Sequence, residues 1–395
     1  GSTVSRLAQD NLLRNPRRTG SNVMSLMVGL VLVILIAVIN SSFRVTLLNW
    51  FDRILQADLL VSSAGRMIAY QVQPLHQDFN KELSQVPGIE LLPNGTVFSM
   101  RFVHVDYEGA SLGLKAFDEG LKEEGYGPFD LVKAEHGQES RRELFQSAEP
   151  TIFVSDNFVV RTKKKIGDFM ELPTPSGLIK FRITGIVVDY ASHLGVIYMD
   201  REVYSKLWRD PLVSVFGVSA KKGYDVQTLR QDIDKRFGKA RNIQAISNKE
   251  MKAEMVGIVD QSFAYTKAIE WAALLVGLLG LLNTLLVSVM ERTRELGMLR
   301  AVGMSRGQMS RMILREALAQ GAFGAIVAVV LGSAVAYLWI THSLTHMLGW
   351  IIEFHFPWVS VLTTVLIGVA VALIAGIYPA RRAANIEIRE ALEYE

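Results

Sequence analysis

Residues 271–290 read WAALLVGLLGLLNTLLVSVM and contain no Asp, Glu, Lys or Arg. About 20 apolar residues in a helix are enough to cross the hydrocarbon core of a bilayer. Three further uncharged stretches, 19–43, 317–352 and 354–380, are also long enough. Half of the 395 residues are hydrophobic, and the four long uncharged stretches exclude a wholly water-soluble protein. The sequence therefore predicts an α-helical integral membrane protein with four transmembrane helices.

The distribution of arginine predicts the orientation of these helices. Four arginines precede the first span, and six lie between the second and third spans, whereas 341–356 contains no Lys or Arg. An excess of Lys and Arg beside the ends of spans marks the cytoplasmic side. We therefore expect both termini and the 291–316 connection to be cytoplasmic, and the long segment between the first two spans to be extracytoplasmic.

That long segment has the sequence pattern of a folded domain. Basic and acidic residues are nearly balanced in it, and short β-branched or aromatic runs recur at 58–62, 96–106, 151–160, 181–189, 196–199, 213–220 and 242–246. Two amphipathic helices are expected, at 75–86 and 226–237. The order of elements predicts a large α+β domain built from both ends of the segment, with a β-rich insertion at about 131–200.

Both spans that flank this domain are predicted to continue past the membrane as helical stalks. Ser247 and Glu250 have the spacing of a capping box, which marks the start of a helix. Apolar and small residues then follow at alternating spacings of four and three, as in a coiled-coil seam: Met251, Met255, Ile258, Ser262, Tyr265 and Ile269. The same pattern also fits an ordinary amphipathic core helix, so both readings stay open.

The cytoplasmic connection carries the most specific pattern. Residues 291–303 read ERTRELGMLRAVG, and Ser305 with Gln308 forms a second capping box after Gly303. This order predicts a short charged helix, a tight turn and a helix that runs into the third span. From the residues alone it could be a solvated loop, an interfacial amphipathic helix or a docking surface for a cytoplasmic partner.

This segment and the C-terminal YPARRAANIEIREALEYE resemble the permease family of MacB, LolC/LolE and FtsX, which are ABC transporters that work by mechanotransmission. The layout also resembles that family, from the N-terminal RLAQDNLLRNPRRT onward. Glu387 and Ile388 stand where the family usually has Asp-Pro. The resemblance implies a multi-pass protein of the bacterial inner membrane. It also implies ATPase-coupling roles for the following residues: Glu291, Arg292, Arg294, Glu295, Leu296, Gly297, Leu299, Arg300 and Gly303.

The chain lacks the residues that ATP hydrolysis requires. No G-x-x-x-x-G-K-[S/T] motif occurs, and the Gly-Lys pair at 238–239 is followed by Ala240, which has no hydroxyl for magnesium. We therefore expect no cofactor in this chain, with ATP and Mg²⁺ held by a partner ATPase. No catalytic residue and no metal site is assigned. The absence of cysteine excludes disulfides and thiolate ligands, and His342, His346, Glu353 and His355 are read as interfacial residues.

The predicted function is a permease subunit that couples ATP hydrolysis on a separate subunit to movement of the extracytoplasmic domain, which extrudes or releases a lipoprotein, peptide, drug or lipid. The alternative is a non-transporting transmembrane regulator of an extracytoplasmic enzyme or sensor. Expected partners are the nucleotide-binding subunit, a second permease copy or homologous half, the lipid bilayer, and a periplasmic adaptor or lipoprotein carrier. No nucleic acid is expected.

The predicted domain boundaries follow from these patterns. They are a cytoplasmic amphipathic helix at 1–21, transmembrane helix 1 and its stalk at 22–56, the α+β domain at 57–246, the second stalk and transmembrane helix 2 at 247–290, the cytoplasmic coupling segment at 291–316, transmembrane helix 3 at 317–340, an outer loop at 341–356, transmembrane helix 4 at 357–380 and a cytoplasmic tail at 381–395.

Overall fold

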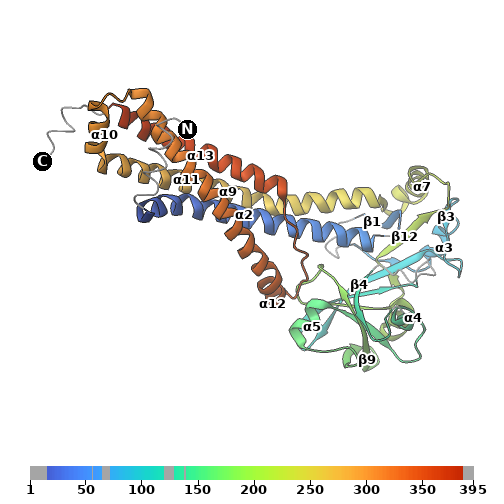
Figure 1. Cartoon of the computed structure of the whole chain (residues 1–395). Coiled ribbons are helices and arrows are strands. Elements are labelled where there is room, and N and C mark those ends of the chain that lie inside the picture. The colour runs from blue at the N-terminus through green and yellow to red at the C-terminus, as the bar shows by residue number, and fades with distance from the viewer. Residues whose placement is uncertain (1–15, 56, 65–71, 120–128, 138, 386–395) are drawn as a thin grey trace. The chain divides into compact units, whose positions relative to one another are not determined.

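The computed structural model describes residues 16–55, 57–64, 72–119, 129–137 and 139–385 (Figure 1). Most of the expected N-terminal amphipathic helix and most of the cytoplasmic tail, including Glu387 and Ile388, lie outside these residues. The described chain forms two compact units. One contains most of the long apolar helices and the other contains the sheet. The sheet unit comprises Arg44–Val259 and Thr341–Ile352, so the first two boundaries fall inside long helices, after Phe43 and before Asp260.

Four described helices are long and apolar enough to cross a membrane, as the sequence predicts. They are α2 (Pro16–Ile54), α9 (Asn248–Glu291), α11 (Arg306–Leu338) and α13 (Trp358–Ala384). A short helix, α10 (Thr293–Ala301), lies between α9 and α11 in the sequence. After α11 come a π-helical turn, η3 (Trp339–Leu344), and α12 (Thr345–Leu348).

Small residues bring the apolar helices into close contact. A Cβ placed on Gly321 of α11 would lie 2.4 Å from the Cβ of Ala372 on α13, and one on Gly368 would lie 2.8 Å from a methyl carbon of Leu30 on α2. A Cβ placed on Gly29 of α2 would lie 2.7 Å from the carbonyl oxygen of Ala273 on α9. Because lipid supplies little hydrophobic driving force between helices, such close backbone approach is a main source of their association.

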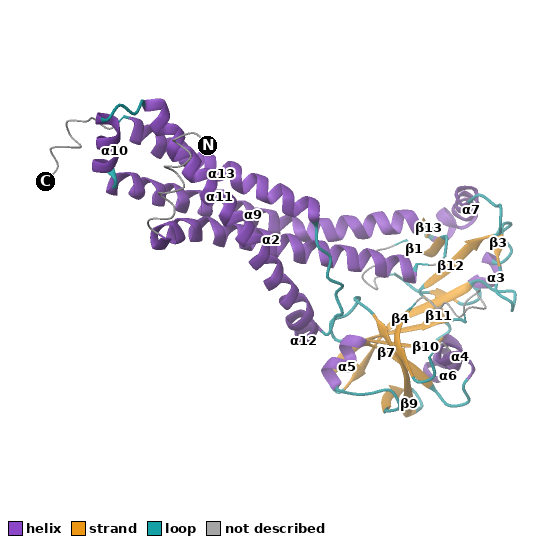
Figure 2. Cartoon of the chain, viewed as in Figure 1, coloured by secondary structure: helices purple, strands orange, loops and turns teal. Residues whose placement is uncertain are grey.

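The sheet unit lies between α2 and α9 in the sequence, which confirms the predicted α+β domain (Figure 2). Its main sheet has the order β13-β1-β12-β4-β5-β10-β7-β9-β6, with β3 paired to β12 and β8 paired to β9. The strands of this sheet are β1 (Leu59–Ser63), β3 (Ile89–Glu90), β4 (Phe98–Tyr107), β5 (Ala110–Phe117), β6 (Asp130–Ala134), β7 (Thr151–Ser155), β8 (Phe169–Thr174), β9 (Gly177–Val188), β10 (Val196–Asp200), β12 (Val215–Ala220) and β13 (Ile243–Ser247).

Short helices and a small second sheet complete this domain. Strand β2 (Leu75–His76) pairs with β11 (Leu212–Val213). The helical segments are α3 (Phe79–Leu83), α4 (Glu139–Gln146), α5 (Asp156–Thr162), α6 (Arg201–Trp208), α7 (Val226–Ile233), the π-helical turn η2 (Asp234–Gly238) and α8 (Lys239–Arg241). The helix expected at 75–86 was therefore too long, because Leu75 and His76 pair with β11 and the helix begins only at Phe79.

The domain has a separate hydrophobic core at each end of the sheet. The first combines residues from both ends of the domain sequence, including Leu59, Phe79, Phe216, Leu229 and Ile243. The second consists mainly of strand residues from the middle of the domain sequence, including Leu114, Ile152, Phe158, Phe181 and Ile197. In agreement with this division, the first strand β1 pairs antiparallel with the last strand β13.

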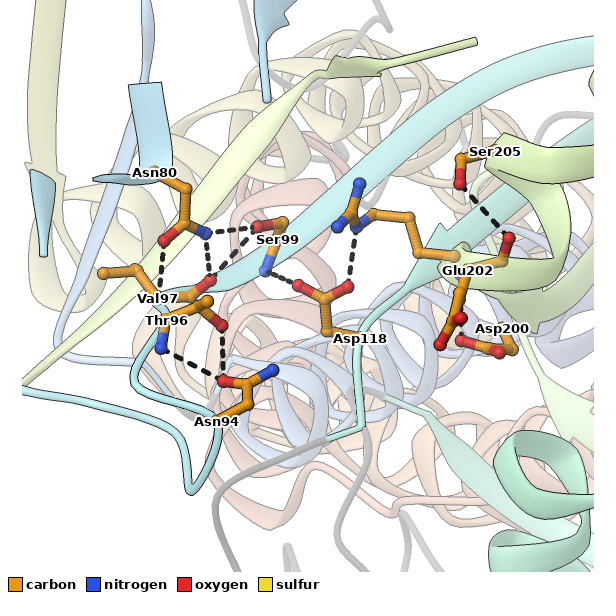
Figure 3. Close-up of polar contacts among 10 residues, drawn as sticks. Asn80, Asn94, Thr96, Val97, Ser99, Asp118, Asp200, Glu202 and Ser205 are labelled. Atoms are coloured by element: carbon orange, nitrogen blue, oxygen red, sulfur yellow. Dashed lines mark hydrogen bonds and ion pairs between the residues drawn. The ribbon is translucent and has the colours of Figure 1, made fainter. Parts of the chain in front are cut away.

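A polar network links α3, β4, the residue after β5 and the start of α6 (Figure 3). Asn80 on α3 donates to the carbonyl oxygen of Val97 at 2.5 Å and to Ser99 Oγ at 2.9 Å. The Ser99 amide donates to Asp118, which also accepts from Arg201 Nε of α6 at 2.6 Å. Burial raises the pKa of Asp118, and the Arg201 charge opposes this effect. The network therefore satisfies polar groups that the sheet would otherwise bury without partners.

Candidate functional site

The predicted coupling segment forms the two-helix turn that its sequence indicates. Gly303 adopts φ +108°, a left-handed conformation that favours glycine, and ends the turn after α10. Ser305 caps α11 by accepting from the Gln308 amide at 3.2 Å, while Gln308 Oε1 accepts from the Ser305 amide at 2.9 Å. The second capping box is thus confirmed.

One face of α10 is anchored on the chain's own helices. Leu296 is 1% exposed and packs in a cluster with Met309 and Met312 of α11 and with Ala380 and Ala383 of α13. The neighbouring residue Gly297 is also buried, and Leu299 is partly buried against the same cluster. These apolar contacts fix α10 against both α11 and α13, because burying a leucine side chain stabilises its position by about 1.5–3 kcal/mol.

Two arginines of the segment also bond to the chain's own helices. Arg292 Nη1 lies 3.5 Å from Glu316 Oε2 of α11, and its Nε lies 3.1 Å from Glu295 Oε2. Both Arg292 and Glu316 are largely buried. Arg300 Nη1 donates to the carbonyl oxygen of Ala384 at 3.1 Å, close to the end of α13. The polar contacts therefore join the same three helices as the apolar cluster.

The opposite face of α10 is exposed. It presents Arg294, Glu295 and Met298, together with Val302 directly after the helix; Glu291, the last residue of α9, is exposed as well. The sequence pattern predicts Val302 on one face with Leu296 and Leu299, and this prediction is wrong, because Val302 is exposed and Leu296 is buried. Val302 is 89% exposed and Met298 is 48% exposed. Met298 and Val302 are four residues apart, and Met298 is three residues from Glu295 and four from Arg294, so these side chains are neighbours on the helix surface.

The predicted stalk residues fall into two groups. Met251 and Met255 are buried against Leu60 and Val215 of the domain's own sheet. The later members Ile258, Ser262, Tyr265 and Ile269 are exposed on α9. The capping box at the start of the helix is confirmed, with Ser247 Oγ accepting from the Glu250 amide at 3.2 Å.

Another face of α9 packs on α2 along the same stretch. Phe43 and Phe263 meet edge to face with ring centroids 5.9 Å apart. Asn40 Nδ2 donates to Thr266 Oγ1 at 2.9 Å. Nearer the domain, Lys252 Nζ lies 2.5 Å from Asp52 Oδ1. The core-helix reading describes Met251 and Met255, which are buried, whereas the later positions are exposed and the seam stays a prediction.

The histidine cluster does not form a metal site among the described residues. Within them, no group of three or more His, Cys, Asp or Glu side chains is arranged to hold a metal ion. His342 Nδ1 instead lies 2.9 Å from Thr341 Oγ1, and the backbone amide of His355 donates to Ser42 Oγ at 2.9 Å.

The chain is similar to several permeases along its whole length or part of it. It is 26% identical over 393 residues to an uncharacterized ABC transporter permease protein of Mycobacterium tuberculosis, an alignment that covers 99% of this chain and 45% of that protein. It is 35% identical over 116 residues to the macrolide export ATP-binding/permease protein MacB of Chlorobaculum tepidum, covering 29% of this chain and 17% of that protein. The chain spans about half the length of the curated relatives it matches.

A solved structure shows a weaker likeness. The periplasmic region of MacB from Actinobacillus actinomycetemcomitans aligns with a TM-score of 0.35 and 12% identity, covering 52% of this chain and 94% of that one.

The family match covers the helices that surround the candidate site. Residues 269–388 match the family described as FtsX-like permease C-terminal, and this range includes α10, the turn at Gly303 and the helices that anchor them. Together with the relatives named ABC transporter permease and MacB, this match supports placing the chain with the MacB/FtsX-like permease family.

Proposed function

We propose that this chain is a permease that couples ATP hydrolysis on a nucleotide-binding subunit to movement of its α+β domain, which extrudes or releases a lipoprotein, peptide, drug or lipid. The observation that carries the proposal is that α10 has one face buried against the chain's own helices and another face exposed. Its inner face is fixed to α11 and α13 through Leu296, and its outer face presents Met298 and Val302. An exposed apolar pair surrounded by charges is typical of a docking surface.

The contacts of α10 explain how force applied to it reaches the membrane helices. Arg292 ties α10 to Glu316 of α11, and Arg300 ties it to the end of α13. Because packed helices resist continuous deformation, a push on the outer face shifts α10 together with these two helices. This transmission of force needs no conduit through the membrane.

The energy source of the proposed cycle lies outside this sequence. Because these residues contain no G-x-x-x-x-G-K-[S/T] motif, the proposal is that a nucleotide-binding subunit holds ATP and Mg²⁺. The MacB relatives are named ATP-binding/permease proteins, a name that covers an ATP-binding part and a permease part. The chain matches only part of their length. The proposal is therefore that α10 docks on that subunit whether or not the two are covalently joined.

The proposed location is the bacterial inner membrane, with both termini and α10 on the cytoplasmic side. The support is the excess of arginine around α10 against its absence from 341–356. The α+β domain is then extracytoplasmic, where an adaptor or lipoprotein carrier would reach it.

A second permease copy is proposed to face the exposed stripe of α9. The stripe begins at Ile258 and continues through Ser262, Tyr265 and Ile269, a period of 3.5 residues that suits helix-to-helix packing. Its partner cannot be α2, because α2 contacts the other face of α9 through Phe43 and Asn40.

Tyr265→Cys should therefore form a disulfide-linked dimer under mild oxidation in membranes. The chain has no natural cysteine, so a single introduced thiol reports only on its own position. Thr266→Cys is the matched control, because Thr266 faces Asn40 of α2, and it should stay monomeric on a non-reducing gel. Equal cross-linking of both variants, or of neither, would contradict the assignment of this stripe to a second copy.

Docking on α10 is tested by Val302→Asp. The substitution leaves the buried face intact, since Val302 is 89% exposed, but it places a charge in the proposed apolar contact. Co-purification of the nucleotide-binding subunit should weaken at least tenfold, as for loss of a central interface residue. Val132→Asp, at an exposed valine of the α+β domain, is the matched control and should leave association unchanged. Retention of the subunit by the Val302 variant would refute docking at this face.

A further inference from the structure

Most of the segment between α11 and α13 belongs structurally to the α+β domain. Residues 341–352 group with the sheet unit, although they follow an apolar helix in the sequence. Within this segment α12 lies beside α5 (Figure 1). The helix ends at Gly349, which has φ +72° and lies so close to Asn157 that an added Cβ would be 2.4 Å from the Asn157 Cα. Glycine is required there for both reasons.

Both backbone groups of Ile351 bond to the domain. Its amide donates to Asp156 Oδ2 at 3.3 Å, and its carbonyl oxygen accepts from the Tyr190 hydroxyl at 2.5 Å. The ring of Trp350 meets the Tyr190 ring edge to face at 5.7 Å, and Tyr190 in turn meets Trp50 of α2 at 5.4 Å. The docking contact is therefore specific rather than a chance approach of two loops.

We propose that residues 345–352 form a latch that closes on the α+β domain at α5, and that protonation of Asp156 strengthens its hold. The latch gives the domain a third attachment to the membrane helices, in addition to the continuous helices α2 and α9. Its release would free the domain to move on those two helices alone.

The surroundings of Asp156 explain why its protonation state matters. The residue is 5% exposed, and its Oδ1 has no hydrogen-bond partner among the described residues. Burial raises the pKa of Asp156 to about 7, and the carboxylate of Asp189 adds to the rise, while backbone amides including that of Ile351 oppose it. A protonated Oδ1 would avoid the burial of an unpaired charge.

The other charged groups near the latch come from three elements. Asp189, which follows β9, accepts from Lys115 Nζ of β5 at 2.5 Å and from the hydroxyl of Tyr198 on β10. The latch itself contributes His346, and the loop after β9 contributes His193; both are exposed. Since histidine can titrate near neutral pH, both histidines need a control.

The direction of the pH effect follows from linkage. We infer that opening of the latch hydrates Asp156. The loss of burial, the largest cause of the raised pKa, lowers it toward the usual value of 3.8, while the loss of the Ile351 amide is a smaller effect in the opposite direction, so the closed state binds the proton more tightly. Closure is therefore strongest in acid, weakens as the pH rises toward about 7 and stays weak above it. The loss can reach about tenfold in the closing equilibrium per pH unit within that window.

Hydrogen exchange measured by mass spectrometry on the full chain in nanodiscs tests the latch. After correction for intrinsic rates, amides of 345–352 should be protected at pH 5.5 and exchange at least tenfold faster at pH 7.5. Asp156→Asn, which keeps an oxygen acceptor but cannot ionise, should keep the acidic level of protection at both values. Gly349→Leu should remove the protection at both, because its side chain would collide with Asn157.

Two controls separate the latch from general effects of pH. Asp200, at the start of α6, is another buried aspartate, and burial raises its pKa to about 6. Asp200→Asn should leave hydrogen exchange of 345–352 as in the wild type. His193→Gln combined with His346→Gln should keep the pH dependence. Unprotected amides at pH 5.5, a pH dependence that persists in Asp156→Asn, or one lost in the histidine variant would each overturn the proposal.

Discussion

Lys115→Met is expected to lower the opening free energy of the β5 and β10 region of the α+β domain by about 3–5 kcal/mol. Lys115 Nζ lies 2.5 Å from Oδ2 of Asp189, whose side chain is fully buried. The ammonium also lies 5.2 Å from the ring centroid of Tyr198 and 5.7 Å from that of Trp50. Methionine fills a similar volume but leaves the Asp189 carboxylate buried without its counter-ion. Breaking a buried ion pair is strongly destabilising because the remaining charge is buried and uncompensated.

Hydrogen exchange of the β5 and β10 amides measures this loss locally, which avoids assuming two-state unfolding of a membrane protein. The matched control is Lys180→Met, since Lys180 pairs with Glu171 at 3.4 Å on the surface and should cost at most about 1 kcal/mol. Adding Asp189→Asn to Lys115→Met should recover part of the stability. If the two lysine substitutions lowered the opening free energy equally, the buried pair would contribute no more to stability than the surface pair.

Features set by local sequence were predictable. The four apolar helices follow from uncharged stretches, and both capping boxes follow from a serine and an acceptor three residues later. The turn after α10 follows from Gly303, because few other residues adopt φ +108°. Each of these signals lies within one or two helical turns of the structure that it specifies.

Features set by distant partners were not predictable in this way. The helix expected from Leu75 begins only at Phe79, because Leu75 and His76 pair with β11 and the Gln77 amide donates to the Pro211 carbonyl. These partners lie more than a hundred residues away in the sequence. Pairing with a distant strand therefore overrode the local helical pattern.

The same limit applies to the candidate site. Leu296, Arg292 and Arg300 have the spacing and charge of docking residues, yet they contact α11 and α13 of the same chain. The amphipathic pattern of α10 identifies two faces but does not say which face the chain itself covers. The exposed face, with Met298 and Val302, becomes visible only once α13 is placed against the buried one.

Leu296→Asp should detach α10 from α11 and α13, because it places a charge at a position that is 1% exposed among Met309, Met312 and Ala380. Burying an unpaired carboxylate and losing the leucine contacts together cost at least about 3 kcal/mol, more than a helix of this length can withstand. Amides of 293–301 should then exchange rapidly, and both binding of the nucleotide-binding subunit and coupled ATP hydrolysis should be lost.

Met298→Asp is the control that separates anchoring from docking, because it adds the same charge to the same helix on its exposed face. It should weaken binding of the nucleotide-binding subunit while the amides of 293–301 keep their wild-type protection. Protection that falls equally in both variants would mean that α10 is only marginally folded, and the exposed face could not act as a fixed docking surface. Protection retained by the Leu296 variant would instead show that the buried cluster does not hold α10, and force applied there would not reach α11 and α13.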